Sequence, residues 1–310
     1  PPVPPSSPPL PSSPPPPPPA APSGGLPPPP PPELSVDSTA MLQAREAGAD
    51  IALTSSAFRS LAALLVSKRE HADIPLVARH DGGRGRVFID RPLGRASLTA
   101  RDKLSLHCRA AARAHLRAAA MLSPSSVPAA PFNAEDHRDQ AMEGGALYTY
   151  ERLRLADLAL LVRCKHHARH APHAGGGAVP LSLKARVEYL LDGGQYEEMS
   201  LPEYASMWAH CMLRGGGAAT LLSHVDVRTG AWVKSSVLRA DALPPPPDGF
   251  DAAHLLQQLH GLLQQLRELP AGTYLLRRLP GMPRFSVWKE GAAEDTSLLG
   301  GFLGGRTALG

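Results

Sequence analysis

VPLSLKARVEY, residues 179–189, has the clearest strand pattern in the chain. Apolar side chains stand at every odd position from Val179 to Tyr189, and polar side chains or proline stand at every even position. Because successive side chains of a strand point to opposite faces of a sheet, this alternation predicts a strand with one apolar and one polar face. The strand opens a block, residues 179–290, from which the main domain can be predicted.

The rest of this block predicts two helices and four more strands. Ser200 and Glu203 have the spacing of a capping box at the start of the first helix. Asp251 caps the second helix, which carries a stripe of leucines. The strands are predicted at residues 220–227, 231–238, 274–276 and 285–289. This order is a split βαβ arrangement, so we expect an α+β fold with an antiparallel-rich sheet and two helices on one face.

Three further elements are predicted outside this block. Residues 54–70 have helical spacing, with Thr54 or Ser55 as the cap. Residues 74–90 read as a hairpin with a glycine-rich turn. Residues 158–164 are a short apolar run that fits a strand covered on both faces, although a helix stays open for them.

A longer helix is predicted at residues 99–122, and it carries a basic stripe. Arg109, Arg113 and Arg117 stand four residues apart and therefore share one helix face. A solvated face is the ordinary interpretation of such a stripe, and contact with phosphates or with an acidic partner is the functional one. The three arginines are therefore candidate partner or nucleic-acid contacts.

Composition divides the chain into four parts. Residues 1–36 are rich in proline, which donates no backbone hydrogen bond, and they predict a disordered tail that is either a linker or a ligand for a proline-binding domain. Residues 37–135 are the N-terminal helix and hairpin region, and residues 136–290 are the main α+β domain. Residues 291–310 are predicted to be a flexible glycine-rich end. The chain begins with proline, as expected of a fragment.

Charge and cysteine usage limit the class of protein only loosely. The formal net charge of +4 permits contact with nucleic acid without requiring it. Three widely separated cysteines are typical of a protein from a reducing compartment rather than of a disulfide framework. We expect no membrane span, because no apolar run approaches about 18 residues.

The motifs of common enzyme classes do not occur in the sequence. It contains no Gly-x-Ser-x-Gly elbow, no phosphate-binding Walker loop and no His-Glu-x-x-His motif. His224 and Asp226 share a strand face and would suit a hydrolase, although a solvated strand face explains them better. We therefore predict that the chain is not an enzyme, and we assign no catalytic residue, no cofactor and no small-molecule substrate.

A cluster of histidines follows the strand at residues 158–164. A zinc site usually draws its four ligands from two spaced pairs, whereas these histidines lie on one loop without a second pair of cysteines. The prediction is therefore a polar loop rather than a metal site. The cluster comprises His166, His167, His170 and His173, with Cys164 just before it.

Several segments together resemble a known family. They are residues 183–190, residues 198–204 leading to Trp208, residues 269–276 and residues 158–163. In order and spacing, these segments are similar to the C-terminal domain of little elongation complex subunit 2. The glycine and histidine insertions around residues 170–177, and those at residues 215–217, depart from the family pattern.

The resemblance implies a function for the chain. It implies a non-catalytic subunit of a nuclear complex that promotes transcription of small nuclear RNA genes by RNA polymerase II. The implied partners are an ELL-type elongation factor and a scaffold subunit, and the implied location is the nucleoplasm, including Cajal bodies. The resemblance supplies no catalytic residues.

Direct nucleic-acid binding is the alternative function that the residues themselves support. Arg277 and Arg278 follow a predicted strand and would make one face of the sheet basic. Sheets that read RNA stack bases on aromatic side chains, and Tyr274, Phe285 and Trp288 are the candidates here. A hydrolase is a third hypothesis.

Overall fold

The computed structural model describes residues 33–81, 84–94, 103–104, 106–107, 140–142, 146–170, 179–189, 198–214, 219–228, 232–282 and 284–290. Of the predicted proline-rich tail at residues 1–36, the structure describes only residues 33–36, in which Leu34 and Ser35 are buried. The stripe of Arg109, Arg113 and Arg117 and the glycine-rich end lie outside the described residues. Within the described ranges, no helix is long and apolar enough to cross a membrane.

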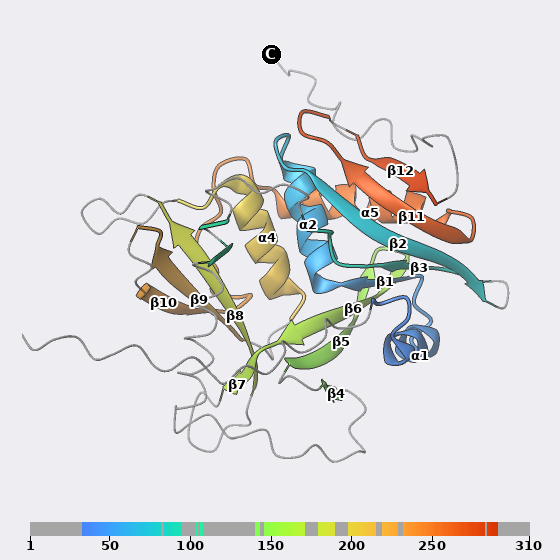
Figure 1. The fold of residues 1–310 in the computed structure, drawn as a ribbon, viewed down its shortest axis with the longest axis horizontal. Helices are drawn as coiled ribbons and strands as arrows, with labels where there is room; N and C mark the ends of the chain where they lie inside the picture. Colours follow the sequence, from blue (N-terminus) through green and yellow to red (C-terminus); the bar gives the residue numbers. More distant parts are fainter. Residues whose placement is uncertain are drawn as a thin grey trace, which may run out of the picture. The chain divides into compact units, whose positions relative to one another are not determined.

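The described residues form two mixed sheets (Figure 1). The larger has eight strands in the order β12-β11-β2-β3-β1-β6-β5-β4, and the smaller has four in the order β10-β9-β8-β7. The strands of the larger sheet are β1 (Ile51–Thr54), β2 (Ala72–Asp81), β3 (Arg84–Ile89), β4 (Gln140–Met142), β5 (Ala146–Leu155), β6 (Leu158–His166), β11 (Gly272–Arg278) and β12 (Ser286–Lys289). Those of the smaller sheet are β7 (Ala168–His170), β8 (Val179–Glu188), β9 (Ala219–Asp226) and β10 (Trp232–Leu238).

Helices cover both faces of the larger sheet. They are α1 (Ser38–Glu46), α2 (Ser55–Val66), α4 (Leu201–Met212) and α5 (Ala252–Arg267). Residues of α2, α4 and α5 share one core cluster with Ile51 and Leu53 of β1, whereas α1 packs with Ala52 on the opposite face. Because alternate residues of β1 meet different helix layers, all four residues of this strand are buried.

The predicted α+β class and the predominance of antiparallel pairing are confirmed. The block of residues 179–290, however, does not form one sheet. Strands β8, β9 and β10 belong to the smaller sheet, whereas β11 and β12 join the larger sheet through β2. Alternation in a sequence identifies the apolar face of a strand, but it does not show which other strand pairs with it. The single sheet was predicted from residues 179–290 alone, whereas β2, the partner of β11, lies far upstream at residues 72–81.

Local signals in the sequence place the helix ends correctly. The Oγ1 atom of Thr54 accepts a hydrogen bond from the Ala57 N–H at the start of α2. Ser200 and Glu203 form the predicted capping box of α4. Asp251 caps α5, whose buried leucines are Leu255, Leu259, Leu262, Leu263 and Leu266. Residues 158–164 lie in strand β6, so the helix that stayed open for them is not formed.

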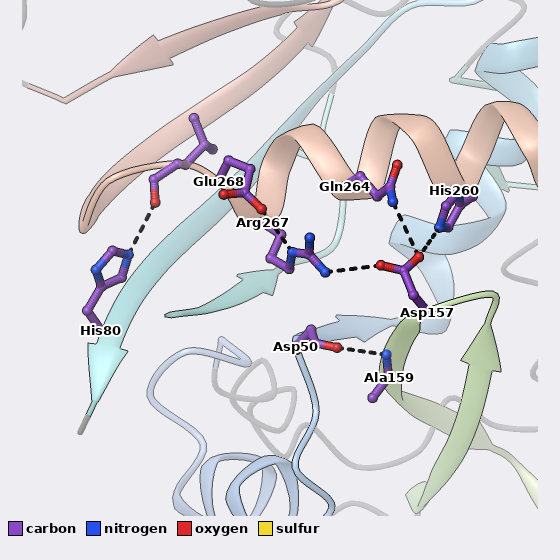
Figure 2. Close-up of polar contacts among 9 residues, drawn as sticks. Asp50, His80, Asp157, Ala159, His260, Gln264, Arg267 and Glu268 are labelled. Atoms are coloured by element: carbon purple, nitrogen blue, oxygen red, sulfur yellow. Dashed lines mark hydrogen bonds and ion pairs between the residues drawn. The ribbon is translucent and has the colours of Figure 1, made fainter. Parts of the chain in front are cut away.

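A polar cluster ties the β5–β6 turn to α5. Asp157, in the turn, accepts hydrogen bonds from His260 at 2.6 Å, Gln264 at 3.3 Å and Arg267 at 3.4 Å. Figure 2 shows these three side chains pointing from one face of α5 towards Asp157. Nearby, the Ala159 N–H donates to Asp50 at 2.9 Å, which fixes β6 against the start of β1.

Candidate anion-binding pocket

A pocket of about 610 Å³ lies where three strands of the larger sheet end. Strand β1 is parallel to β3 on one side and to β6 on the other, so the carboxyl ends of all three meet at the same edge. Helix α2 begins directly after β1. Ligands of open sheets commonly bind outside the carboxyl ends of parallel strands. Residues of β8 and of the end of α4 complete the lining.

The lining of this pocket is strongly basic. Two carboxylates also line it, Glu33 and Asp90, and Asp90 accepts hydrogen bonds from the Leu34 N–H. Six cationic side chains therefore line the pocket with two carboxylates, and one of the six, Arg163, is paired with Asp37 at 2.6 Å. The remaining excess of cations makes the pocket attractive to anions. The cations are Arg59, Arg91, Arg163, Lys165, Lys184 and Arg214.

The N-terminus of α2 adds to the positive potential. Thr54, Ser55 and Ser56 all line the pocket at the first turn of this helix. The first backbone N–H groups of a helix have no partner within the helix, and the helix dipole places partial positive charge there. The Thr54 side chain satisfies the Ala57 N–H. The Ser56 hydroxyl hydrogen-bonds the Thr54 hydroxyl at 3.1 Å.

Arg214 is the buried cation at the centre of this arrangement. Its guanidinium donates to the Ser182 hydroxyl at 2.9 Å, to the His210 carbonyl at 2.8 Å and to the Lys165 carbonyl at 3.2 Å. These acceptors are all neutral, and no ion pair joins Arg214 to a carboxylate of the described residues. Burial lowers the pKa of Arg214 from its ordinary value, but a guanidinium remains charged at neutral pH. The pocket wall therefore holds a charge that an anion would compensate.

His210 presents a buried donor to the same pocket. Its Nδ1 lies 2.9 Å from Nη1 of Arg214 and must accept that hydrogen bond, because a guanidinium only donates. The ring proton therefore sits on Nε2, which is buried and finds no hydrogen-bond partner in the described part of the chain. Burial, with Lys184 and Arg214 nearby, holds the pKa of His210 well below its ordinary 6.5, so the ring is neutral. An unmet buried donor is costly, and an oxygen atom of a ligand would satisfy it.

The pocket does not suit a divalent cation. Calcium and magnesium are bound by oxygen ligands, chiefly carboxylates and carbonyls, whereas this lining has more cations than carboxylates. Elsewhere in the described part of the chain, no group of three or more His, Cys, Asp or Glu side chains is placed to hold a metal ion. The chemistry that the pocket offers is charge-assisted hydrogen bonding to an anion.

The structure separates the two described arginines that were predicted as contacts. Arg277 lies on β11, with Nε 2.8 Å from one oxygen of Asp73 and Nη2 3.1 Å from the other. Arg278 points the other way and is only 2% exposed. They therefore lie on opposite faces of the sheet. Their roles as partner contacts stay predictions, as do those of Arg109, Arg113 and Arg117.

The structure pairs His224 with Glu188 rather than with Asp226. Nδ1 of His224 lies 2.6 Å from Glu188, a fully buried carboxylate that also pairs with Arg186 at 2.7 Å. His224 and Arg186 line a second cavity of about 820 Å³, next to the proline-rich segment 244–247. The Asp226 carboxylate instead accepts a hydrogen bond from the Arg228 N–H. Because Glu188 lies on the neighbouring parallel strand, sequence spacing could not reveal this pair.

The predicted histidine loop is dispersed as far as it is described. His166 hydrogen-bonds Thr149 at 2.9 Å, and His167 accepts the Leu183 N–H at 3.2 Å. His170 ends strand β7, and His173 lies outside the described residues. The two placed rings therefore join the end of β6 to β5 of the same sheet and to β8 of the smaller sheet.

The pocket residues that matter most were not singled out from the sequence. Lys184 was assigned only to the polar face of the strand at residues 179–189. His210 and Arg214 stand four residues apart at the end of α4, a spacing that places them on one helix face. This spacing was the available signal. The spacing alone does not show that Arg214 also contacts Lys165 of β6 and Ser182 of β8.

Two kinds of comparison relate the chain to known proteins. A model of the family described as NMDA receptor-regulated gene protein 2 C-terminus matches residues 137–299. This match confirms the resemblance to the C-terminal domain of little elongation complex subunit 2 and fits a nuclear regulatory protein. A search of the curated proteins found no match.

The fold is similar to that of Rai1 from S. pombe. Rai1 in complex with 3′-FADP shares 12% identity, with coverage of 84% of this chain and 84% of that chain and a TM-score of 0.50. A Rai1 mutant with three glutamates substituted, also in complex with 3′-FADP, shares 12% identity over 82% and 77% of the two chains, with a TM-score of 0.51. A further Rai1 structure shares 11% identity with the same coverage and TM-score. Identities this low show a shared fold.

Two predictions from the sequence are therefore wrong. The first is that the chain is a non-catalytic subunit that works only through protein–protein contacts, and the second is that an enzyme is excluded. The described residues share the fold of a protein that was solved with a bound nucleotide, 3′-FADP. The absence of a motif excludes only the enzyme families that use that motif. The fold shared with Rai1 is not one that the missing motifs exclude.

Proposed function

The chain belongs to the NMDA receptor-regulated gene protein 2 C-terminal family, and from this premise we propose that its domain binds phosphate groups of nucleic acid, RNA foremost, in the basic pocket. One observation carries the proposal. Arg214 is a buried cation without a carboxylate partner among the described residues, and His210 beside it presents a buried N–H without an acceptor. A phosphate oxygen meets both needs at once.

The surroundings favour phosphate over a carboxylate ligand. Exposed Arg91 stands at the rim, and half-buried Lys165 and Lys184 lie deeper, so cations surround the cavity on several sides. The first turn of α2 adds partial positive charge, and helix N-termini are common phosphate sites. A phosphate has more oxygen atoms than a carboxylate and can use several of these donors together. The similarity of the fold to Rai1 bound to 3′-FADP supports a nucleotide-containing ligand.

Charge reversal at the pocket tests this function. We expect the substitutions Arg91→Glu and Lys184→Glu each to weaken binding of a single-stranded RNA by about tenfold or more at low salt, because each replaces an attraction to phosphate with a repulsion. The substitution Arg228→Glu is the matched control, since it makes the same charge change at a 65% exposed side chain outside the pocket. Binding is measured by fluorescence anisotropy with RNA and DNA of one sequence and with inorganic phosphate as competitor.

A subtler variant tests the buried donor. His210→Asn places an amide oxygen near the position of Nδ1, so it can still accept from Arg214, but it lacks the Nε2 donor. We expect weaker RNA binding by a variant that still unfolds cooperatively, and thermal unfolding checks that the fold is kept. Equal affinities of all pocket variants and the wild type, or an equal loss in Arg228→Glu, would overturn the proposed function. Tighter binding of DNA than of RNA would mean that DNA, rather than RNA, is the ligand of this pocket.

The partner proteins and the precise location are separate proposals that rest on the family. We propose that the partners are an ELL-type elongation factor and a scaffold subunit, and that the location within the nucleus includes Cajal bodies. Affinity purification from nuclear extract tests the partners, and imaging of the tagged chain tests the location. Recovery of neither protein under conditions that preserve nuclear complexes would reject the partner proposal.

A further inference from the structure

We propose that Trp288 is a stacking platform for an unpaired base of the nucleic acid whose phosphates occupy the basic pocket, an inference that rests on the proposed function. Trp288 lies on β12, the last described strand at one edge of the larger sheet. Its side chain is 39% exposed, although tryptophan is usually well covered. The other two aromatic candidates, Tyr274 and Phe285, are buried.

The platform is held in place by its neighbours. The Arg277 guanidinium lies 5.8 Å from the centroid of the Trp288 ring, within the range of a cation–π contact. Asp73 binds this guanidinium through both carboxylate oxygens, at 2.8 and 3.1 Å. The pair of charges is close to neutral overall, so this site would attract a base by stacking rather than attract a phosphate. A fixed aromatic ring loses little conformational entropy when it stacks.

The platform is continuous with the pocket. Pro75 lines the pocket, and it stands opposite Leu275, which in turn stands opposite Trp288. Residues in register across neighbouring strands share a face. Pro75 and Leu275 are half-buried, so a partly open apolar path leads from the pocket rim to Trp288. Figure 1 shows β2, β11 and β12 side by side in this order.

The separation matches a short piece of one nucleic-acid strand. Neighbouring strands of a sheet lie about 4.8 Å apart, so Trp288 is about 10 Å from Pro75 across the sheet. Stacked nucleotides of one strand advance about 3.4 Å each, so about three nucleotides span the path from the Pro75 rim of the pocket to the ring. The Leu93 N–H donates to the Asp73 carbonyl at 2.8 Å, which joins the pocket rim to the support of the platform. The ligand class is therefore single-stranded, because bases of a duplex are not free to stack on a side chain.

Substitution of the ring tests the inference. We expect Trp288→Ala to weaken binding of a single-stranded RNA by about tenfold, the usual size of a lost base–aromatic stack, and Trp288→Phe to retain most of the affinity. Val237→Ala is the matched control, because Val237 is an exposed apolar side chain on a strand of the other sheet, 51% exposed. The same RNA with abasic sites in place of its bases isolates stacking from phosphate contact.

The outcomes separate this inference from the proposed function. Wild-type protein that fails to bind RNA rejects the proposed function and this inference with it. Tight binding by the wild type and equally tight binding by Trp288→Ala rejects the platform alone. A loss in Trp288→Ala that is just as large with the abasic RNA also rejects it, because no base is then being read. Loss of a protein partner with unchanged RNA affinity would assign the ring to a protein interface instead.

Discussion

Arg278 shows how one charged residue can be held inside the apolar layer of the sheet. Its Nε donates to the Met282 carbonyl at 3.2 Å, and its guanidinium lies 5.4 Å from the centroid of the Phe285 ring. Both terminal nitrogens are buried and have no hydrogen-bond partner among the described residues. Burial lowers the pKa of Arg278 from its ordinary value. A charged group with unmet donors in such a place opposes folding.

This environment predicts that the protein is more stable with a neutral side chain at position 278 than with the native arginine. We expect Arg278→Met to raise the free energy of unfolding by about 1–3 kcal/mol, because unmet buried donors are removed and an apolar stem is kept. Urea unfolding followed by circular dichroism measures the change. Arg277→Met is the control and should cost about 0.2–1 kcal/mol, since it breaks a half-exposed ion pair. A clear loss of stability in Arg278→Met would mean that the guanidinium is satisfied in solution.

Residues whose roles are local could be predicted from the sequence. Thr54 (with Ser55 as the alternative), Ser200 and Asp251 were predicted as caps, because capping bonds join groups only two or three residues apart. Arg214 was not identified, because its meaning depends on Lys165 and Ser182, which reach it only through the fold. The same reason explains why spacing alone put His224 beside Asp226 on one strand face, whereas the carboxylate that His224 contacts is Glu188.

At the scale of elements, the β5–β6 hairpin and α5 are joined by one carboxylate. Asp157 receives bonds from three successive turns of α5 (Figure 2). The hydrogen bond from His260 holds the pKa of Asp157 below its ordinary value. The folded state therefore binds the proton less readily than the unfolded state does. The stabilising contribution is fully present above pH 3.8 and is lost as the pH falls through the folded-state pKa.

We expect Asp157→Asn to lower Tm modestly near neutral pH, because the amide cannot attract His260 and Arg267 as a carboxylate does. The difference in Tm from the wild type should shrink in acid, where the native carboxyl is protonated. Thermal unfolding across a pH series measures it. Asp241→Asn is the control, since Asp241 pairs only with exposed Arg239 among the described residues. A difference that stays constant into strong acid would show that charge is not the cause.

The ends of helices and strands could be predicted from the sequence better than the pairing of one strand with another. Strand β8 follows from strict alternation, and α5 follows from its leucine stripe, since both patterns lie within one segment. The parallel pairing of β8 with β9 and the joining of β11 to β2 depend on contacts between distant segments. Order alone therefore predicted one sheet where the chain forms two.

At the scale of the molecule, the candidate site lies where elements of both sheets meet. Arg214 bonds the carbonyl of Lys165 on β6 of the larger sheet and the hydroxyl of Ser182 on β8 of the smaller sheet. The His167 N–H also donates to the Leu181 carbonyl, which fixes the same junction. The pocket residues thus come from several separate segments of the chain. No single motif encodes the pocket, so the family resemblance identified the domain without revealing this site.

The salt dependence of RNA affinity tests the central claim of phosphate binding in this pocket most directly. For single strands, the slope of log affinity against log salt concentration falls by about 0.7 for each phosphate contact that is lost. We expect the wild type to show a clear negative slope and Arg91→Gln to show a slope shallower by about that amount, with Arg228→Gln unchanged. A wild-type affinity that does not depend on salt, or a slope that Arg91→Gln leaves unaltered, would contradict the account.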